Sequence, residues 1–126
     1  MKRGLKFLRL AISEAEKSDH KQRVGAIIFK AKTVFSKGHN YSSKSVRSIT
    51  KKFCRWPNSI HAEVDCILKA KRDLSGMNIL IVRINKKGEL RYAKPCRQCL
   101  AYLFHVSIRN VYYSTSYGTI EKIGLR

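Results

Sequence analysis

Three potential metal ligands and one separate carboxylate are the chemically most informative residues of this chain. The tripeptide His-Ala-Glu at 61–63 is followed later by Pro-Cys-Arg-Gln-Cys at 95–99. His61, Cys96 and Cys99 supply one imidazole and two thiolates, which leave the fourth position of a tetrahedral zinc ion to water, whereas structural zinc sites use four protein ligands. Glu63 is then free to move protons. Each motif alone is weak, but the two in this order predict a hydrolytic zinc site.

Both motifs lie where helices are expected to begin. Asn58 and Ser59 are good N-cap residues, and the segment 61–71 has the apolar spacing of a helix with one buried stripe. Pro95 introduces a second helix over 96–106, whose first turn carries both cysteines on one face. Helix N-termini carry partial positive charge, so their convergence on the metal would favour thiolates and a bound hydroxide.

The remaining chain alternates between helical and strand patterns. An amphipathic helix is predicted over about 4–18, and strands over 24–29, 33–36, 77–84, 111–114 and 119–123, with turns at 30–32 and 85–88. The last two strands are joined by only four residues. They should therefore form an antiparallel hairpin, because a parallel pair needs a longer crossover.

H-x-E with a later P-C-x-x-C is a signature of zinc-dependent nucleobase deaminases. Together with the order of elements, it makes nearly the whole chain similar to the cytidine deaminase-like superfamily. The resemblance implies an α/β fold, a three-layer α/β/α sandwich around a five-stranded mixed sheet. It also implies that His61, Cys96 and Cys99 hold Zn²⁺ and that Glu63 is the proton shuttle. A histidine as first ligand resembles the nucleotide and polynucleotide branches more than the free-cytidine branch.

The same resemblance implies how the substrate is held and changed. Asn40 would hydrogen-bond the sugar or base, Ala62 would offer backbone contacts to the base, and Val24, Gly25 and Ala26 would belong to the pocket. Zinc-activated water would attack C4 of cytosine, or C6 of adenine, with Glu63 transferring the protons. His39 is expected at a solvent-facing strand end rather than in the pocket.

Length and composition suit a single domain over residues 1–126. With 44% hydrophobic residues the chain can build a core, and it has neither an apolar stretch near 18 residues nor a hydrophobic signal region. We therefore expect a cytoplasmic protein without a membrane partner. Among the other cysteines, Cys66 is expected in the core as a small hydrophobe and Cys54 to be buried or idle.

The charge bears on the substrate. Lys and Arg number 27 against 8 Asp and Glu, a formal net charge of +19, which is more than solubility requires. Basic residues and aromatic side chains surround the two metal motifs: Lys44, Arg47, Lys51, Lys52, Arg55 and Trp56 before the first, and Arg91, Tyr92, Lys94 and Arg97 around the second. This combination predicts deamination of cytosine to uracil in single-stranded nucleic acid, with DNA favoured over RNA.

Two alternatives stay open. Lysine-rich sequences also arise from biased genomes, so the substrate could be free cytidine, deoxycytidine or deoxycytidylate. An antiparallel last strand resembles the free-nucleoside and some toxin-like branches of the superfamily, whereas a parallel one resembles transfer-RNA and deoxycytidylate deaminases. A non-catalytic, zinc-stabilised nucleic-acid binder is the other alternative, and Glu63 speaks against it. The charge makes a monomer plausible, whereas family resemblance implies a small homo-oligomer.

Overall fold

The apolar strand β1 (Arg23–Lys30) lies inside the sheet, because it pairs with another strand on each side. The structure is a computed structural model that describes residues 2–19, 22–42 and 59–125. β1 runs antiparallel to β2 (Thr33–His39) on one side and to β5 (Asn78–Ile84) on the other. Its residues 25–28 are buried, as expected of a strand covered on both faces.

The second half of the sheet starts with a parallel pair. β7 (Asn110–Ser114) lies parallel to β5, because α4 (Arg97–His105) lies in the crossover between them. β8 (Ile120–Gly124) pairs antiparallel with β7, which gives the order β2-β1-β5-β7-β8. The predicted antiparallel hairpin at the end of the chain is confirmed.

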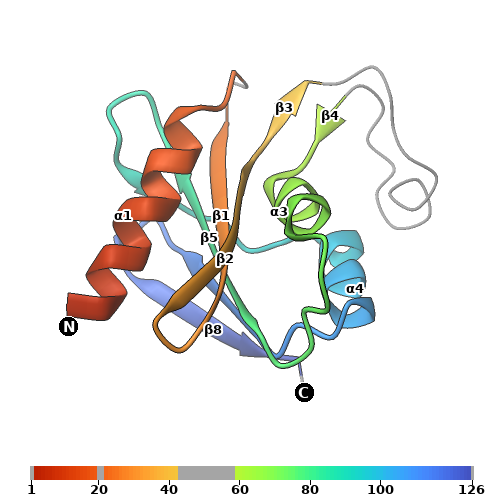
Figure 1. Cartoon of the computed structure of the whole chain (residues 1–126). Helices are drawn as coiled ribbons and strands as arrows, with labels where there is room; N and C mark the ends of the chain where they lie inside the picture. The colour runs from red at the N-terminus through yellow and green to blue at the C-terminus, as the bar shows by residue number, and fades with distance from the viewer. Residues whose placement is uncertain (1, 20–21, 43–58, 126) are drawn as a thin grey trace.

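Helices cover both faces of this sheet (Figure 1). α1 (Lys2–Glu16) lies on one face and buries Phe7, Ala11 and Ala15 against apolar residues of β1 and β5. α3 (Ala62–Ala70) and α4 lie on the other face, above a core that includes Ile79 and Ile81 of β5. The predicted three-layer sandwich around a mixed sheet is therefore confirmed. None of the helices described has the length and apolar composition needed to cross a membrane.

Three short strands were not predicted. β6 (Leu90–Arg91) pairs with the end of β5, while β3 (Tyr41–Ser42) and β4 (Ser59–Ile60) pair with each other. Strands this short show no periodicity in a sequence. The predicted N-cap role of Ser59 is wrong, because Ser59 pairs with Ser42 and His61 is the N-cap residue of α3; Asn58 lies outside the described residues.

Candidate metal centre and active site

The metal motifs meet at the N-termini of α3 and α4. His61 is the N-cap of α3 and Cys96 is the N-cap of α4, both with extended backbone conformation, and Cys99 lies in the first turn of α4. The ligand atoms of His61, Cys96 and Cys99 all lie within 4.8 Å of one another. Cys99 is buried, His61 is half-buried and Cys96 is exposed, so the site opens to one side. Convergence of the two helix starts, predicted from the sequence, is observed.

Distances and donor chemistry fit zinc. The Cys99 Sγ and His61 Nδ1 atoms are 3.6 Å apart. Zinc–sulfur and zinc–nitrogen bonds of ordinary length at a tetrahedral angle would separate two such atoms by about 3.6 Å. A hydrogen bond from the Cys99 thiol, helped by backbone N–H groups of the first turn of α4, lowers the pKa of Cys96 to about 6. A thiol of that pKa readily becomes the thiolate that zinc prefers.

Glu63 lies in the first turn of α3, two residues after His61, and is 5% exposed. Burial raises the pKa of its carboxyl above the usual range, although a backbone hydrogen bond acts in the opposite direction. A carboxyl group shifted toward neutral pH can accept and return a proton within one reaction cycle. Its placement suits the predicted role of proton shuttle.

A pocket of about 320 Å³ connects Glu63 to the metal ligands. Glu63, Ala62, His61 and Cys96 line it from the start of α3 and α4, and the rest of the lining comes from β1, β5 and the segments before β1, after β2 and before α4. The other residues that line it are Gln22, Val24, Asn40, Ile81, Arg83, Tyr92, Ala93, Lys94 and Pro95. This volume is at the lower end of the range of small-molecule sites.

Asn40 lines the pocket, but both ends of its side chain also hold the backbone of the chain. Its Oδ1 atom accepts a hydrogen bond from the Val24 N–H at 2.9 Å, and its Nδ2 atom donates one to the Gln22 carbonyl at 2.6 Å. Asn40 therefore fastens the end of β2 to the start of β1. The amide retains a second N–H and a second lone pair, which leaves capacity for the predicted contact with a substrate.

Gly25 and Ala26 do not line this pocket, although Val24 does. A Cβ atom at Gly25 would lie 2.2 Å from the Ala11 carbonyl oxygen, so Gly25 allows α1 to approach β1 closely. Ala26 is fully buried in the core beneath α3 and its carbonyl accepts the Cys66 thiol at 3.6 Å. Both residues serve helix packing in the structure, and their contact with substrate stays a prediction.

The structure describes only some of the basic and aromatic residues predicted to bind nucleic acid, and only some of those line the pocket. Tyr92 and Lys94 line the pocket, whereas Arg91 lies on β6 with an ion-pair distance of 3.8 Å to Glu89, and Arg97 is exposed at the start of α4; neither arginine lines the pocket. The other predicted nucleic-acid contacts lie outside the described residues: Lys44, Arg47, Lys51, Lys52, Arg55 and Trp56. Cys54 is also outside them.

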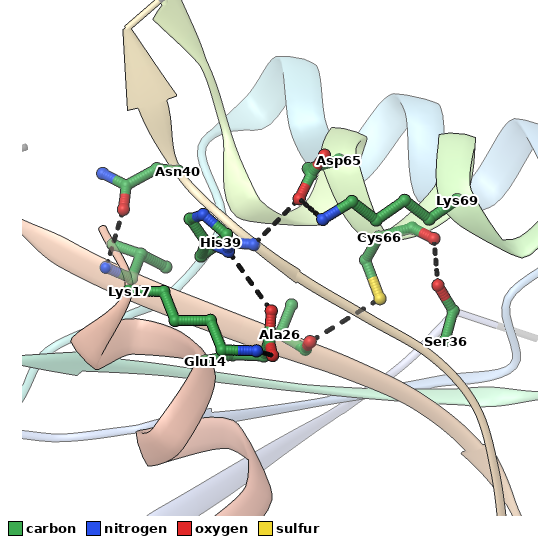
Figure 2. Close-up of polar contacts among 10 residues, drawn as sticks. Glu14, Lys17, Ala26, Ser36, His39, Asn40, Asp65, Cys66 and Lys69 are labelled. Carbon is green, nitrogen blue, oxygen red and sulfur yellow. Dashed lines mark hydrogen bonds and ion pairs between the residues drawn. The ribbon is translucent and has the colours of Figure 1, made fainter. Parts of the chain in front are cut away.

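His39 is not the solvent-facing strand end that we expected. Its Nδ1 atom is 3.2 Å from Glu14 Oε1, and its backbone N–H donates to Asp65 Oδ2 at 3.0 Å (Figure 2). Glu14 and Asp65 are both buried, and each also pairs with a lysine, Lys17 or Lys69. Cys66 faces the core as predicted, and burial raises the pKa of its thiol to about 12.

Arg83 and Gln22 are pocket residues that the sequence analysis missed. Neither is near a metal motif in the chain. Alternation along the predicted strand 77–84 could have placed Arg83 on the same face as Ile79 and Ile81, but it could not have shown which helices cover that face.

Comparison with known proteins adds a relative of similar sequence and two similar folds. The chain is 29% identical over 97 residues to a protein of Aliivibrio fischeri described as an uncharacterized deaminase in the luxG 3′ region; the match covers 75% of this chain and 59% of that protein. The dCMP deaminase of cyanophage S-TIM5 superposes with a TM-score of 0.64 at 21% identity, covering 90% of this chain and 84% of the phage chain. Cytidine deaminase from Burkholderia pseudomallei gives a TM-score of 0.66 at 17% identity, covering 96% and 91%.

The family comparison covers the whole catalytic core described above. Residues 1–115 match the family described as the cytidine and deoxycytidylate deaminase zinc-binding region. This stretch contains α1, the central strands, both metal motifs and Glu63. With its His/Cys/Cys zinc site at the start of α3 and α4, the chain belongs to the cytidine and deoxycytidylate deaminase zinc-binding family.

Proposed function

We propose that this chain is a zinc-dependent hydrolase that deaminates the cytosine ring of a free nucleoside or nucleotide to uracil. One observation carries this proposal: the buried carboxylate Glu63 lines the same small pocket as the metal ligands His61 and Cys96. A site built only to hold a structural metal has no use for an unliganded, buried carboxylate beside it. This argues against the alternative of a non-catalytic zinc-stabilised binder.

Glu63 carries the protons of the reaction. When bound, zinc supplies a Lewis acid that brings the pKa of a coordinated water toward neutrality. Glu63 accepts a proton from the water whose oxygen attacks C4 of cytosine, and passes it to N3 of the ring. Glu63 then takes the remaining proton from the oxygen now bound to C4 and transfers it to the amine as the C4–N4 bond breaks, and the products are uracil and ammonia.

The family and the structures that share the fold favour a free substrate over a polymer. A volume of about 320 Å³ suits one nucleoside or nucleotide, and an antiparallel β8 is a feature that resembles free-nucleoside deaminases. Two structures that share the fold are described as a dCMP deaminase and a cytidine deaminase. These observations support the small-substrate alternative more than the single-stranded nucleic acid that the sequence favoured.

A single-stranded polynucleotide is the second candidate substrate. The net charge of +19 favours it, because such an excess of positive charge attracts phosphodiester backbones. The cations proposed to bind a strand are those of the segment 44–55, with Trp56 as a stacking surface. High charge alone makes many oligonucleotides bind, so conversion of cytosine to uracil must be measured rather than binding.

The test is an assay of uracil formation by the zinc-loaded protein. Cytidine, deoxycytidine, their 5′-monophosphates and single-stranded DNA and RNA are offered separately, and bases are analysed by chromatography. Glu63→Gln should reduce the rate by at least roughly 10²-fold while zinc stays bound. Glu121→Gln, which removes an exposed carboxylate on β8, is the matched control. Near-normal deamination by Glu63→Gln would refute the mechanism, and conversion of oligonucleotides alone would favour the second candidate.

A further inference from the structure

Arg83 belongs to the active-site face of the sheet. Side chains alternate along β5, and Ile79 and Ile81 pack in the core beneath α3 and α4, whereas Leu80 and Val82 pack under α1. Arg83 follows Ile81 by two residues and therefore shares its face. It is half-buried and lines the pocket that contains Glu63.

Strand pairing places a second arginine directly beside Arg83. In the register of the sheet, Arg83 is opposite Val24 on one side and Arg91 of β6 on the other. Ser114 holds this arrangement, because its Oγ accepts a hydrogen bond from the Arg83 N–H at 3.1 Å and donates one to the Arg91 carbonyl at 2.6 Å. Like charges directly opposite on paired strands destabilise a sheet unless something neutralises them.

No protein carboxylate neutralises Arg83 in the part of the chain that the structure describes. Neither Arg83 nor Lys94 forms an ion pair there, while Arg91 has Glu89 at 3.8 Å. Among the described residues that line the pocket, Glu63 is the one acidic side chain, and the proposed reaction requires it for proton transfer. The lining of the pocket thus includes two cationic side chains without a protein carboxylate partner among the described residues, which favours an anionic ligand.

We propose that Arg83 and Lys94 form a phosphate subsite of this pocket, so that the substrate is a cytosine mononucleotide whose 5′-phosphate they bind. A guanidinium group presents paired N–H donors that match phosphate oxygens, and a lysine adds a point charge. The inference rests on the proposed function, because the base of the same molecule would lie against Glu63 and Ala62. A phosphodiester of a polynucleotide has the same chemistry, and conversion of oligonucleotides distinguishes it from the terminal phosphate of a mononucleotide.

The first experiment compares dCMP with deoxycytidine as substrates of the zinc-loaded full chain. Arg83→Gln should lower the ratio of kcat/KM for dCMP to that for deoxycytidine by about tenfold to a hundredfold, as expected when a charge-assisted hydrogen bond is lost. Arg83→Lys should recover part of this ratio. Arg109→Gln removes the same charge from an exposed residue outside the pocket and should leave the ratio as in the parent.

The second experiment uses inorganic phosphate and needs no variant. Phosphate should raise the KM of the parent protein for dCMP, because both compete for the subsite. It should leave the KM for deoxycytidine unchanged, because deoxycytidine has no phosphate and does not occupy the subsite. Chloride at equal ionic strength is the control. Equal inhibition of both reactions, or an unchanged substrate ratio in Arg83→Gln, overturns the inference while the proposed deaminase function stands. If the parent converts oligonucleotides alone, the subsite binds a phosphodiester of a polynucleotide, and the inference of a mononucleotide substrate is also overturned. If the parent converts no cytosine compound, the proposed function itself fails.

Discussion

The backbone N–H of His39 donates a hydrogen bond to the buried carboxylate of Asp65 at 3.0 Å, and this bond joins the edge strand β2 to the helix that carries Glu63 (Figure 2). On the other side, the His39 ring contacts Glu14 of α1. Asn40, the next residue after His39, lines the pocket. His39 therefore connects the helices on the two faces of the sheet, and it directly precedes Asn40 of the pocket lining.

Asp65→Ala should lower the free energy of unfolding of the zinc-loaded protein by about 1–3 kcal/mol, because it leaves the His39 N–H without its partner in a half-buried place. Lys69→Gln removes only the half-exposed partner of Asp65, so its cost should stay below about 1 kcal/mol. Urea unfolding measures both. Equal effects of the two substitutions would show that the bond to His39 does not stabilise the fold.

Glu14 should contribute stability that acid removes. Burial opposes its charge, but hydrogen bonds from Lys17 and His39 outweigh burial and hold the pKa of Glu14 below its ordinary value of 4.5. This contribution is fully present above pH 4.5 and is lost as the pH falls through the lower folded-state pKa. Glu14→Gln should therefore lose less stability than Glu16→Gln, its exposed control on α1, when urea unfolding is repeated from pH 6 down to about pH 3. Zinc loss in acid is common to both variants. Parallel pH profiles would contradict the assignment.

Gly25→Ala should destabilise the protein by about 1–3 kcal/mol, because the new methyl group would collide with backbone atoms of α1. Gly124→Ala is a suitable control, since a Cβ atom there would have only an ordinary contact of 3.7 Å. Thermal unfolding distinguishes the two substitutions. A substrate-contact role for Gly25 would instead raise KM without a comparable change in melting temperature.

Cys96→Ser should lower both zinc content and stability, because the three ligands connect the starts of α3 and α4. Cys66→Ala is the control: it removes a buried thiol that contacts the Ala26 carbonyl and should leave zinc content unchanged. Elemental analysis of the purified proteins gives the metal content. Full zinc occupancy in Cys96→Ser would exclude this cysteine from the ligand set.

The polynucleotide alternative predicts a distinct dependence on salt. If the basic residues of the segment 44–55 contact phosphates, the logarithm of the affinity for a single strand should fall with the logarithm of salt concentration, with a slope near −0.7 for each contact. Replacing Lys44, Arg47, Lys51, Lys52 and Arg55 by Gln should flatten this slope. The control replaces five exposed lysines that do not line the pocket: Lys30, Lys32, Lys37, Lys86 and Lys87. Equal slopes in both variants would assign strand binding to overall charge.

Much of the architecture follows from local patterns. The continuous apolar run of β1 and the amphipathic pattern of α1 predicted their elements to within about two residues. The short connection between β7 and β8, residues 115–119 in the structure, was enough to predict their antiparallel pairing. The two-residue strands β3, β4 and β6 could not be predicted, because strands of that length exist only through their partners.

The sequence by itself determined the metal centre, because His61, Glu63, Cys96 and Cys99 occupy the first turns or N-caps of two helices, where spacing of two or three residues is enough to bring side chains together. Only the tertiary structure decided what lies opposite them. Arg83 reaches the pocket through strand pairing, and Gly25 is excluded from it by the close approach of α1. These positions depend on which helix covers which face of the sheet, and that is a property of long-range packing that no local spacing encodes.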